Sequence, residues 1–188
     1  KGGNVQLRRE IAVAAAENLR FRGINALLVS HGSSTVPPYI VERINALGGA
    51  IKNANGIPIE ELKAVIHCGI RKINVDTDIR LAVTRNFREY FTGRPEKRKS
   101  PSVGAVWELM EKNSDKFDPR IFLPPVMDLM IVETEITDPD VLDLVALVKA
   151  GVREVVGALI VSFGSLGHAD DVETKSLEQM AQFYSRTR

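Results

Sequence analysis

The side chains most suited to chemistry lie in residues 72–80, where a short apolar strand is followed by polar residues that open a helix. In a parallel strand of a closed barrel, successive side chains point to opposite faces. Asn74 and Asp76 are therefore expected to face the barrel axis, whereas Ile73 and Val75 meet the outer helices. Polar side chains at the carboxyl end of such a strand indicate substrate handling, because active sites of this architecture gather there.

The start of the helix that follows this strand is suited to anion binding. Asp76 or Thr77 can cap it, and its free N–H groups and dipole favour a phosphate. Arg80 lies one turn further and can reach a second phosphate. Two other interpretations remain open, namely a capped helix with a surface arginine and a magnesium site built from Asp76 and Asp78. Capping alone does not account for Asn74.

A second candidate motif, residues 30–34 (Ser-His-Gly-Ser-Ser), follows the first apolar strand. His31 at the carboxyl end of a strand can be a metal ligand or a general base. Gly32 lets main-chain N–H groups approach an anion, and the serine hydroxyls add further donors. A histidine that merely caps a turn would explain the same residues.

Composition limits the classes of function. The chain has 188 residues, 25 Lys and Arg against 24 Asp and Glu, and a net charge of +1, which gives no case for nucleic acid or an anionic membrane as partner. One cysteine, Cys68, excludes an internal disulfide framework. No apolar run approaches a spanning helix, and residues 1–4 do not form a signal peptide. We therefore expect a cytoplasmic protein that forms a single domain around one hydrophobic core.

The order of apolar patterns predicts an α/β fold with parallel strands. We expect helices at 5–22, 37–47, 58–68 and 77–91, and strands at 26–30 and 72–75. Residues 92–102, with the basic run that starts at Arg94, are expected to form a solvated linker. Helices are then expected around 106–110, at 118–132 and at 138–151, followed by a helix or strand at 152–163 and an amphipathic tail at 176–184.

Taken together, several motifs resemble the C-terminal half of class II (zinc-dependent) fructose-1,6-bisphosphate aldolase. They are His31-Gly32-Ser33-Ser34, Gly48-Gly49, Gly56-Ile57-Pro58, residues 72–78 and Phe117-Asp118-Pro119-Arg120. The similarity covers about residues 1–120 and resumes at 163–169 and in the tail. Residues 132–152 look like an insertion or a divergent helix relative to the family pattern.

The resemblance implies a TIM (β/α)8 barrel. Residues 1–92 would supply C-terminal βα units of the barrel, and residues 93–188 a helical extension that packs on the barrel and the subunit interface. It also implies a Zn²⁺ ion that is held by three histidines, polarises the ketone of dihydroxyacetone phosphate and stabilises its enediolate. A monovalent cation is a second candidate cofactor.

The same resemblance implies roles for individual residues. His31 corresponds to a zinc ligand, and Asn74 to a catalytic residue that touches the substrate near the reacting carbons. Positions around the triose phosphate correspond to Gly32, Ser34, Asp76 and Thr77.

The remaining implied positions are basic. Arg80 corresponds to the arginine that holds the far phosphate, and Lys1 to a phosphate-contacting lysine. Arg120 corresponds to an arginine donated across a subunit interface, which implies a homodimer or homotetramer.

The chain also departs from the family pattern. The other two zinc histidines and the aspartate that moves the substrate proton lie upstream in the family, and neither His67 nor His168 takes their place. Two strands cannot close a barrel. We therefore expect this sequence to be part of a longer polypeptide, or to be completed by a second chain, with exposed strand edges and apolar helix faces.

The function expected from these observations is reversible cleavage of fructose 1,6-bisphosphate to dihydroxyacetone phosphate and glyceraldehyde 3-phosphate. The partner would be a phosphorylated sugar. Tagatose-bisphosphate aldolase is one alternative. A non-catalytic half-barrel that serves binding or assembly is another.

Overall fold

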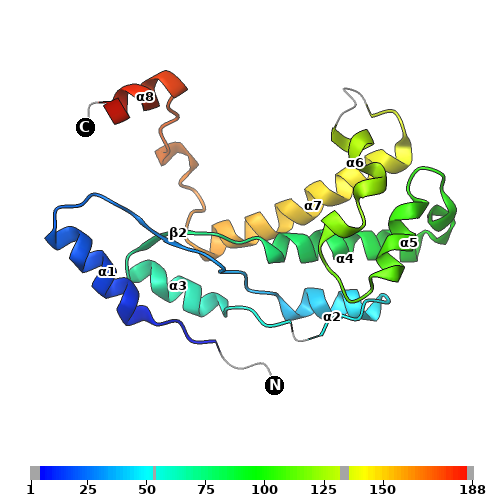
Figure 1. The fold of residues 1–188 in the computed structure, drawn as a ribbon, viewed down its shortest axis with the longest axis horizontal. Coiled ribbons are helices and arrows are strands. Elements are labelled where there is room, and N and C mark those ends of the chain that lie inside the picture. The colour runs from blue at the N-terminus through cyan, green and yellow to red at the C-terminus, as the bar shows by residue number, and fades with distance from the viewer. Residues whose placement is uncertain (1–4, 53, 132–135, 186–188) are drawn as a thin grey trace.

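The computed structural model describes residues 5–52, 54–131 and 136–185. Within them the chain is mostly helical and contains a small parallel sheet, so the expected α/β composition is confirmed at that level (Figure 1). The first half contains α1 (Arg9–Phe21), β1 (Leu28–Ser30), α2 (Pro38–Ala46), α3 (Ile59–His67), β2 (Ile70–Ile73) and α4 (Thr77–Gly93). The second half contains the 3-10 turn η1 (Pro95–Lys99), α5 (Gly104–Lys112), η2 (Pro119–Ile121), α6 (Pro124–Ile131), α7 (Pro139–Ser162), η3 (Ala169–Asp171) and α8 (Leu177–Ser185).

The sheet consists of β1 and β2, which pair in parallel, with Ser30 opposite Ile73. Both strands were predicted, although β1 is shorter than expected because regular pairing begins at Leu28, and β2 keeps the expected length but begins and ends two residues earlier. Beyond the last paired residues, the Asn74 N–H donates to the Ser30 carbonyl over 3.0 Å. The Ser33 N–H donates in turn to the Asn74 carbonyl over 3.3 Å. These bonds hold the carboxyl ends of the two strands together.

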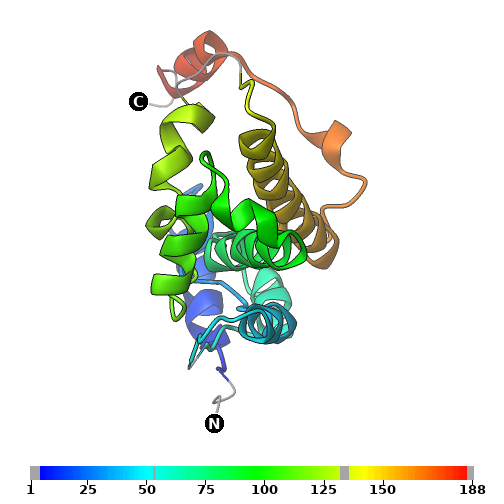
Figure 2. The same ribbon diagram turned by 90° about the vertical axis from the view of Figure 1, so that its right-hand side faces the viewer.

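The helix α4 lies at the centre of the packing. Leu81, Phe87 and Phe91 are fully buried, which confirms the predicted inner face of this helix. α4 and α7 run side by side in two views at right angles (Figure 1 and Figure 2). This contact crosses the expected boundary between residues 92 and 93, and the division into two parts stays a prediction.

Two apolar clusters flank α4. The larger one gathers the second half of α4 with α5, α6 and the start of α7, around Phe87 and Phe122, whose ring centroids are 5.9 Å apart. The smaller one joins the start of α4 to α2 and to the later part of α7 through Ile40, Ile44 and Val155. α4 is therefore held by apolar packing along its whole length, which fixes the position of its first turn.

The helix pattern of the second half differs from the prediction in two places. The helix expected at 118–132 is divided into η2 and α6, because Asp118 caps a short turn and Pro124 starts a new helix; Val132 lies outside the described residues. The segments expected at 138–151 and 152–163 form one helix, α7, with Asp138 as its N-cap. Much of the supposed insertion at 132–152 is thus the first half of α7.

The prediction of a solvated linker at 92–102 is wrong. Lys97 and the Ser100 hydroxyl both bond the carboxylate of Asp140 in the first turn of α7. The Arg98 guanidinium stacks 4.3 Å from the centre of the Trp107 ring. The basic side chains have partners in the fold because acidic residues gather at the start of α7. The dipole of α7 favours negative charge at that end of the helix.

Apolar surface remains exposed at the other end of the molecule, as expected. α1 has no buried residue, Phe21 is 91% exposed, and Val29 in β1 is 40% exposed. In the view of Figure 1, α8 lies apart from the main body. The helices of the described residues are too short or too polar to span a bilayer.

Two glycines of α7 provide a matched test of its packing on α4. A Cβ added to the buried Gly151 would lie 3.0 Å from the backbone nitrogen of Val83, whereas one added to Gly157 would meet nothing within 4 Å. We expect Gly151→Ala to lower the free energy of unfolding by about 1–3 kcal/mol through overpacking. Gly157→Ala should raise it by about 0.5–1 kcal/mol through helix propensity. Urea unfolding of both variants measures this, and equal effects would contradict the packing of α7 on α4.

Candidate functional site

A pocket of about 530 Å³ lies at the carboxyl ends of the two strands. Its lining comes from the loop after β1 and from the turn between β2 and α4: Gly32, Ser34, Ile73, Asn74, Val75, Asp76 and Thr77. The structure therefore brings together five of the residues predicted to handle substrate, namely Gly32, Ser34, Asn74, Asp76 and Thr77. Ile73 and Val75, which were expected to meet the outer helices, also contribute to this lining.

His31 and Asn74 meet across the two strand ends. The Asn74 amide nitrogen lies 3.1 Å from His31 Nδ1, so each side chain orients the other. This contact occupies one ring nitrogen of the imidazole and leaves Nε2 for another partner. The amide nitrogen is a donor, so Nδ1 accepts and Nε2 of the neutral ring carries the proton, which it can donate. A metal at Nε2 would require the Asn74 amide to turn, so that its oxygen accepts from Nδ1–H.

The first turn of α4 is capped from another part of the chain. Asp76 is the N-cap residue by position, but its side chain makes no capping bond. Instead, the Ser34 hydroxyl oxygen accepts hydrogen bonds from the backbone N–H groups of Asp76 and Thr77, at 3.3 and 3.1 Å. The predicted capping by Asp76 or Thr77 is therefore wrong, and Ser34 joins the loop after β1 to the start of α4.

Asp78 was considered as a magnesium ligand together with Asp76, and the structure contradicts this interpretation. Its carboxylate is buried, and both oxygens accept hydrogen bonds from Thr35 and Val36. The Asp76 carboxylate instead bonds Arg80 and is largely exposed. The signal for a buried Asp78 was its spacing, since it lies three and four residues before Leu81 and Ala82 on the inner face of α4.

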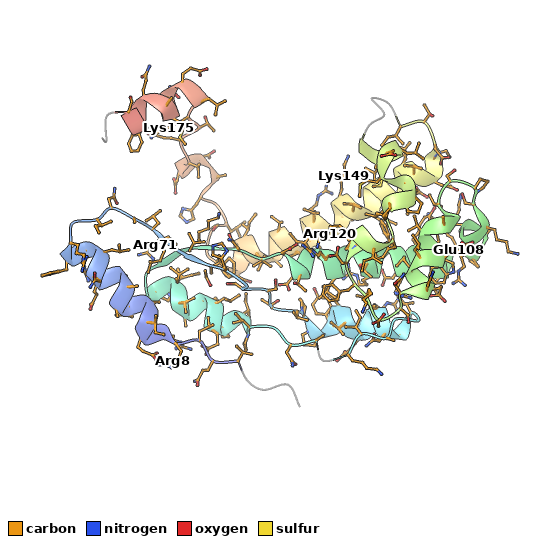
Figure 3. The ribbon with its side chains drawn as sticks, in the orientation of Figure 1. Arg8, Arg71, Glu108, Arg120, Lys149 and Lys175 are labelled. Carbon is orange, nitrogen blue, oxygen red and sulfur yellow. The ribbon has the colours of Figure 1, made fainter. Side chains whose placement is uncertain are left out.

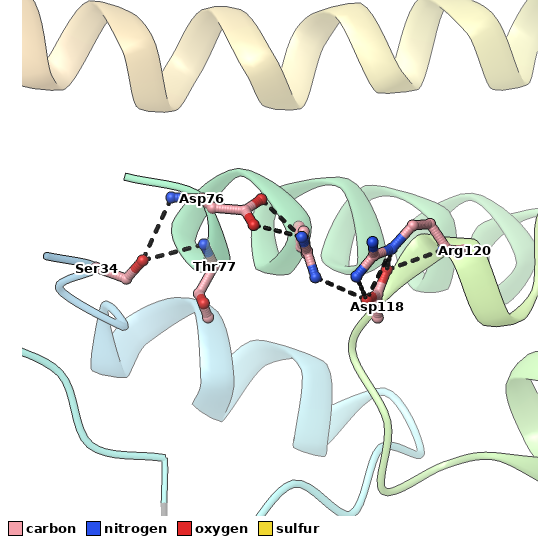
Figure 4. Close-up of polar contacts among 6 residues, drawn as sticks. Ser34, Asp76, Thr77, Asp118 and Arg120 are labelled. Carbon is pink, nitrogen blue, oxygen red and sulfur yellow. Dashed lines mark hydrogen bonds and ion pairs between the residues drawn. The ribbon is translucent and has the colours of Figure 1, made fainter. Parts of the chain in front are cut away.

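Arg80 pairs with both Asp76 and Asp118 and so forms the centre of a chain of charges, whose other members, Asp76, Asp118 and Arg120, are labelled in Figure 4. Its guanidinium bonds the carboxylate of Asp76 and, over 2.7 Å, that of Asp118. Arg120 bonds the same Asp118 carboxylate and its hydrogen bond holds the pKa of Asp118 below the ordinary aspartate value. Two arginines therefore share one carboxylate. The sequence predicted Asp118 as a helix cap and did not predict that it pairs with Arg80 and Arg120.

The position of Arg120 follows from this contact. Its side chain is 70% exposed and lies beside α4, although η2 lies about 40 residues further along the chain (Figure 3). Arg80 is less exposed, at 27%, because two carboxylates surround it. Arg80 and Arg120 thus form a cationic pair near the pocket, and Arg120 retains donors that can point away from this chain.

The described residues do not by themselves form a metal centre. No group of three or more His, Cys, Asp or Glu side chains in the part of the chain that the structure describes is arranged to hold an ion. His168 bonds Asp171 in an exposed loop, away from His31. Lys1, expected to contact a phosphate, lies outside the described residues. His31 is therefore the one candidate ligand that lies at this site among the described residues.

Comparison with known proteins gives a consistent result. The family described as "Fructose-bisphosphate aldolase class-II" matches residues 2–168 of the chain. The fructose-bisphosphate aldolase of Nostoc sp. is 33% identical over 176 residues, which is 94% of this chain and 38% of the relative. That of Xanthobacter flavus is 34% identical over 84% of this chain and 33% of its own length. The class 2 enzyme of Synechocystis sp. is 38% identical over 64% of this chain and 28% of its own length.

The chain thus spans about a third of the length of the curated relatives that it matches. The match includes both strand ends, the start of α4 and the Asp118 and Arg120 segment, which together make up the site described above. On the extent of this match, the chain belongs to the class II fructose-bisphosphate aldolase family.

Proposed function

We propose that this chain forms the phosphate-binding side of an aldolase active site that reversibly cleaves fructose 1,6-bisphosphate to dihydroxyacetone phosphate and glyceraldehyde 3-phosphate. The observation that carries the proposal is the meeting of His31 and Asn74 with the Ser34-capped start of α4 around one pocket. Family membership supports the reaction class, and the relatives are named for the fructose substrate. Neither tagatose bisphosphate nor a purely non-catalytic function has an observation in its favour.

The triose phosphate would bind between Gly32 and the first turn of α4. Gly32 has a positive φ of 66°, so its backbone approaches the pocket without a side chain in the way. The partial positive charge at the helix start favours an anion, and the Ser34 hydroxyl lies between the two segments. The Asp76 carboxylate is bound to Arg80 and its backbone N–H donates to Ser34, so a phosphate that takes this N–H would have to replace the Ser34 hydroxyl.

Asn74 is proposed to act on the substrate carbons adjacent to this phosphate. Its amide lies at the pocket and contacts His31, so it can hold a substrate hydroxyl or carbonyl in a fixed direction while it keeps the imidazole in place. Arg80 would hold the second phosphate. Because Asp76 and Asp118 neutralise it in the free protein, the phosphate would have to replace at least one of these carboxylates.

Zinc dependence is part of the proposal, with His31 as one ligand. A catalytic zinc site ordinarily has three protein ligands, and the described residues offer one at this place. The proposal therefore requires ligands from beyond the described residues, and we derive no chemical step through the metal. We also propose a closed TIM barrel, a cytoplasmic location, a monovalent cation as a second cofactor, and a homodimer or homotetramer that uses Arg120.

The first prediction concerns His31. The full-length protein should cleave fructose 1,6-bisphosphate, and a zinc chelator should remove this activity. His31→Ala should lower kcat by at least about 100-fold, because the imidazole contacts Asn74 at the pocket and the residues that line the pocket include no other imidazole. His168→Ala is the matched control and should retain full activity, since His168 lies in an exposed loop. Wild-type turnover by His31→Ala would refute its assignment as a ligand.

A second prediction separates the two phosphates. Arg80→Ala should raise KM for fructose 1,6-bisphosphate about 10-fold, a low estimate for a charge-assisted bond because the free arginine is already paired. KM for fructose 1-phosphate, which lacks the far phosphate, should hardly change. Arg43→Ala removes an exposed pair with Glu89 and should alter neither value. An equal rise in KM for both substrates would mean that Arg80 supports the folded structure and does not bind the second phosphate.

A further inference from the structure

The carboxylate of Asp78 is a buried charged group in the first turn of α4. Its residue is 1% exposed. One oxygen accepts from the Thr35 backbone N–H at 2.9 Å and from the Thr35 hydroxyl at 2.8 Å, and the other accepts from the Val36 N–H at 2.7 Å. All three donors belong to the loop between β1 and α2. The carboxylate thus binds α4 to this loop through three charge-assisted hydrogen bonds.

The loop that receives these bonds is strained. Val36 has a φ of 49°, a conformation that a β-branched side chain rarely adopts. Such a conformation persists only where neighbouring contacts hold it. The bond from the Val36 N–H to Asp78 is one such contact. On the other side, Gly56 fits closely against the Thr35 carbonyl, and the Ile57 N–H donates to the Ser34 carbonyl over 3.0 Å.

Ser34 directly precedes the two residues that Asp78 holds. The position of its hydroxyl, which caps α4 and lines the pocket, therefore depends on the path that the backbone takes at Thr35 and Val36. We propose that Asp78 is a positioning residue, whose buried carboxylate fixes the loop after β1 so that Ser34 and Gly32 form the phosphate-binding side of the pocket. The identity of the ligand in this inference rests on the proposed function. The fixing of the loop by Asp78 rests on the observed contacts alone.

The proposed part played by Asp78 differs from those of its acidic neighbours. Asp76 and Asp118 pair with arginines, and a bound phosphate can compete with them for these partners. Asp78 forms no ion pair with the residues that the structure describes, and its bonds come from neutral donors of the loop. Substrate binding therefore leaves its bonds intact, and the loop is fixed before the phosphate arrives, which lowers the cost of ordering it.

The test compares Asp78→Asn with Thr35→Val and Ser34→Ala in the full-length protein. The first variant keeps the shape of the side chain but removes its charge and one acceptor. The second removes only the hydroxyl donor, so it remains informative if Asp78→Asn does not fold. Hydrogen exchange of the peptide that covers residues 33–37 reports on the loop, and calorimetric titration with dihydroxyacetone phosphate reports on the site.

We expect Asp78→Asn to increase exchange in this peptide at least 10-fold, while the peptide from α5 exchanges as in the wild type. Its Kd for dihydroxyacetone phosphate should rise about 10-fold, and Thr35→Val should give smaller changes in the same direction. Thr35→Ser, which keeps the hydroxyl, should restore wild-type values. Ser34→Ala should weaken binding as well, and the effects of Asp78→Asn and Ser34→Ala should be clearly non-additive, since one residue acts through the other.

Three results would overturn the proposal. They are unchanged exchange at residues 33–37 in Asp78→Asn, an unchanged Kd in a folded variant with altered exchange, or additive effects of the two substitutions on Kd. If the wild-type protein does not bind dihydroxyacetone phosphate, the proposed function fails. The exchange measurements then still support or overturn the fixing of the loop by Asp78.

Discussion

The burial of α4 is the constraint on which the rest of the structure depends. α2 and α7 pack on this helix, and its second half enters the larger apolar cluster. The buried Arg88 guanidinium extends the same arrangement, because it donates to the carbonyls of Leu47 and Met110 where α2 and α5 end. The packing of these neighbouring helices on α4 fixes its position. The strand β2 leads directly into it, so the polar residues between them are fixed as well.

Charge is organised locally around this helix rather than across the molecule. The net charge of +1 hides a cluster in which each cation of the site has an acidic partner. Asp118 serves both Arg80 and Arg120, and the hydrogen bond from Arg120 favours its ionised form by lowering its pKa. The free site is therefore close to electrically balanced, and an incoming dianion would redistribute existing ion pairs instead of meeting unpaired arginines.

Local patterns predicted much of the first half of the fold. Pro58 and Gly69 bracketed α3 correctly, because proline suits a helix start and a positive φ at glycine suits its end. The pocket residues followed from the rule that parallel strands present their carboxyl ends together. The prediction failed where partners are distant in sequence. The docking of residues 94–102 on α7, the capping of α4 by Ser34 and the enclosure of Asp78 all depend on contacts between segments that spacing alone does not bring together.

The capping of α4 by Ser34 has a consequence for the order in which the chain folds. The hydroxyl and the N–H groups that it accepts from lie about 43 residues apart. A loop of that length has to close before the helix start is satisfied, and its closure entropy is not recovered by any local contact. The first turn of α4 therefore frays until the strands have paired. The helix terminus and the binding pocket then become ordered in a single cooperative step, so a partly folded chain carries no functional pocket.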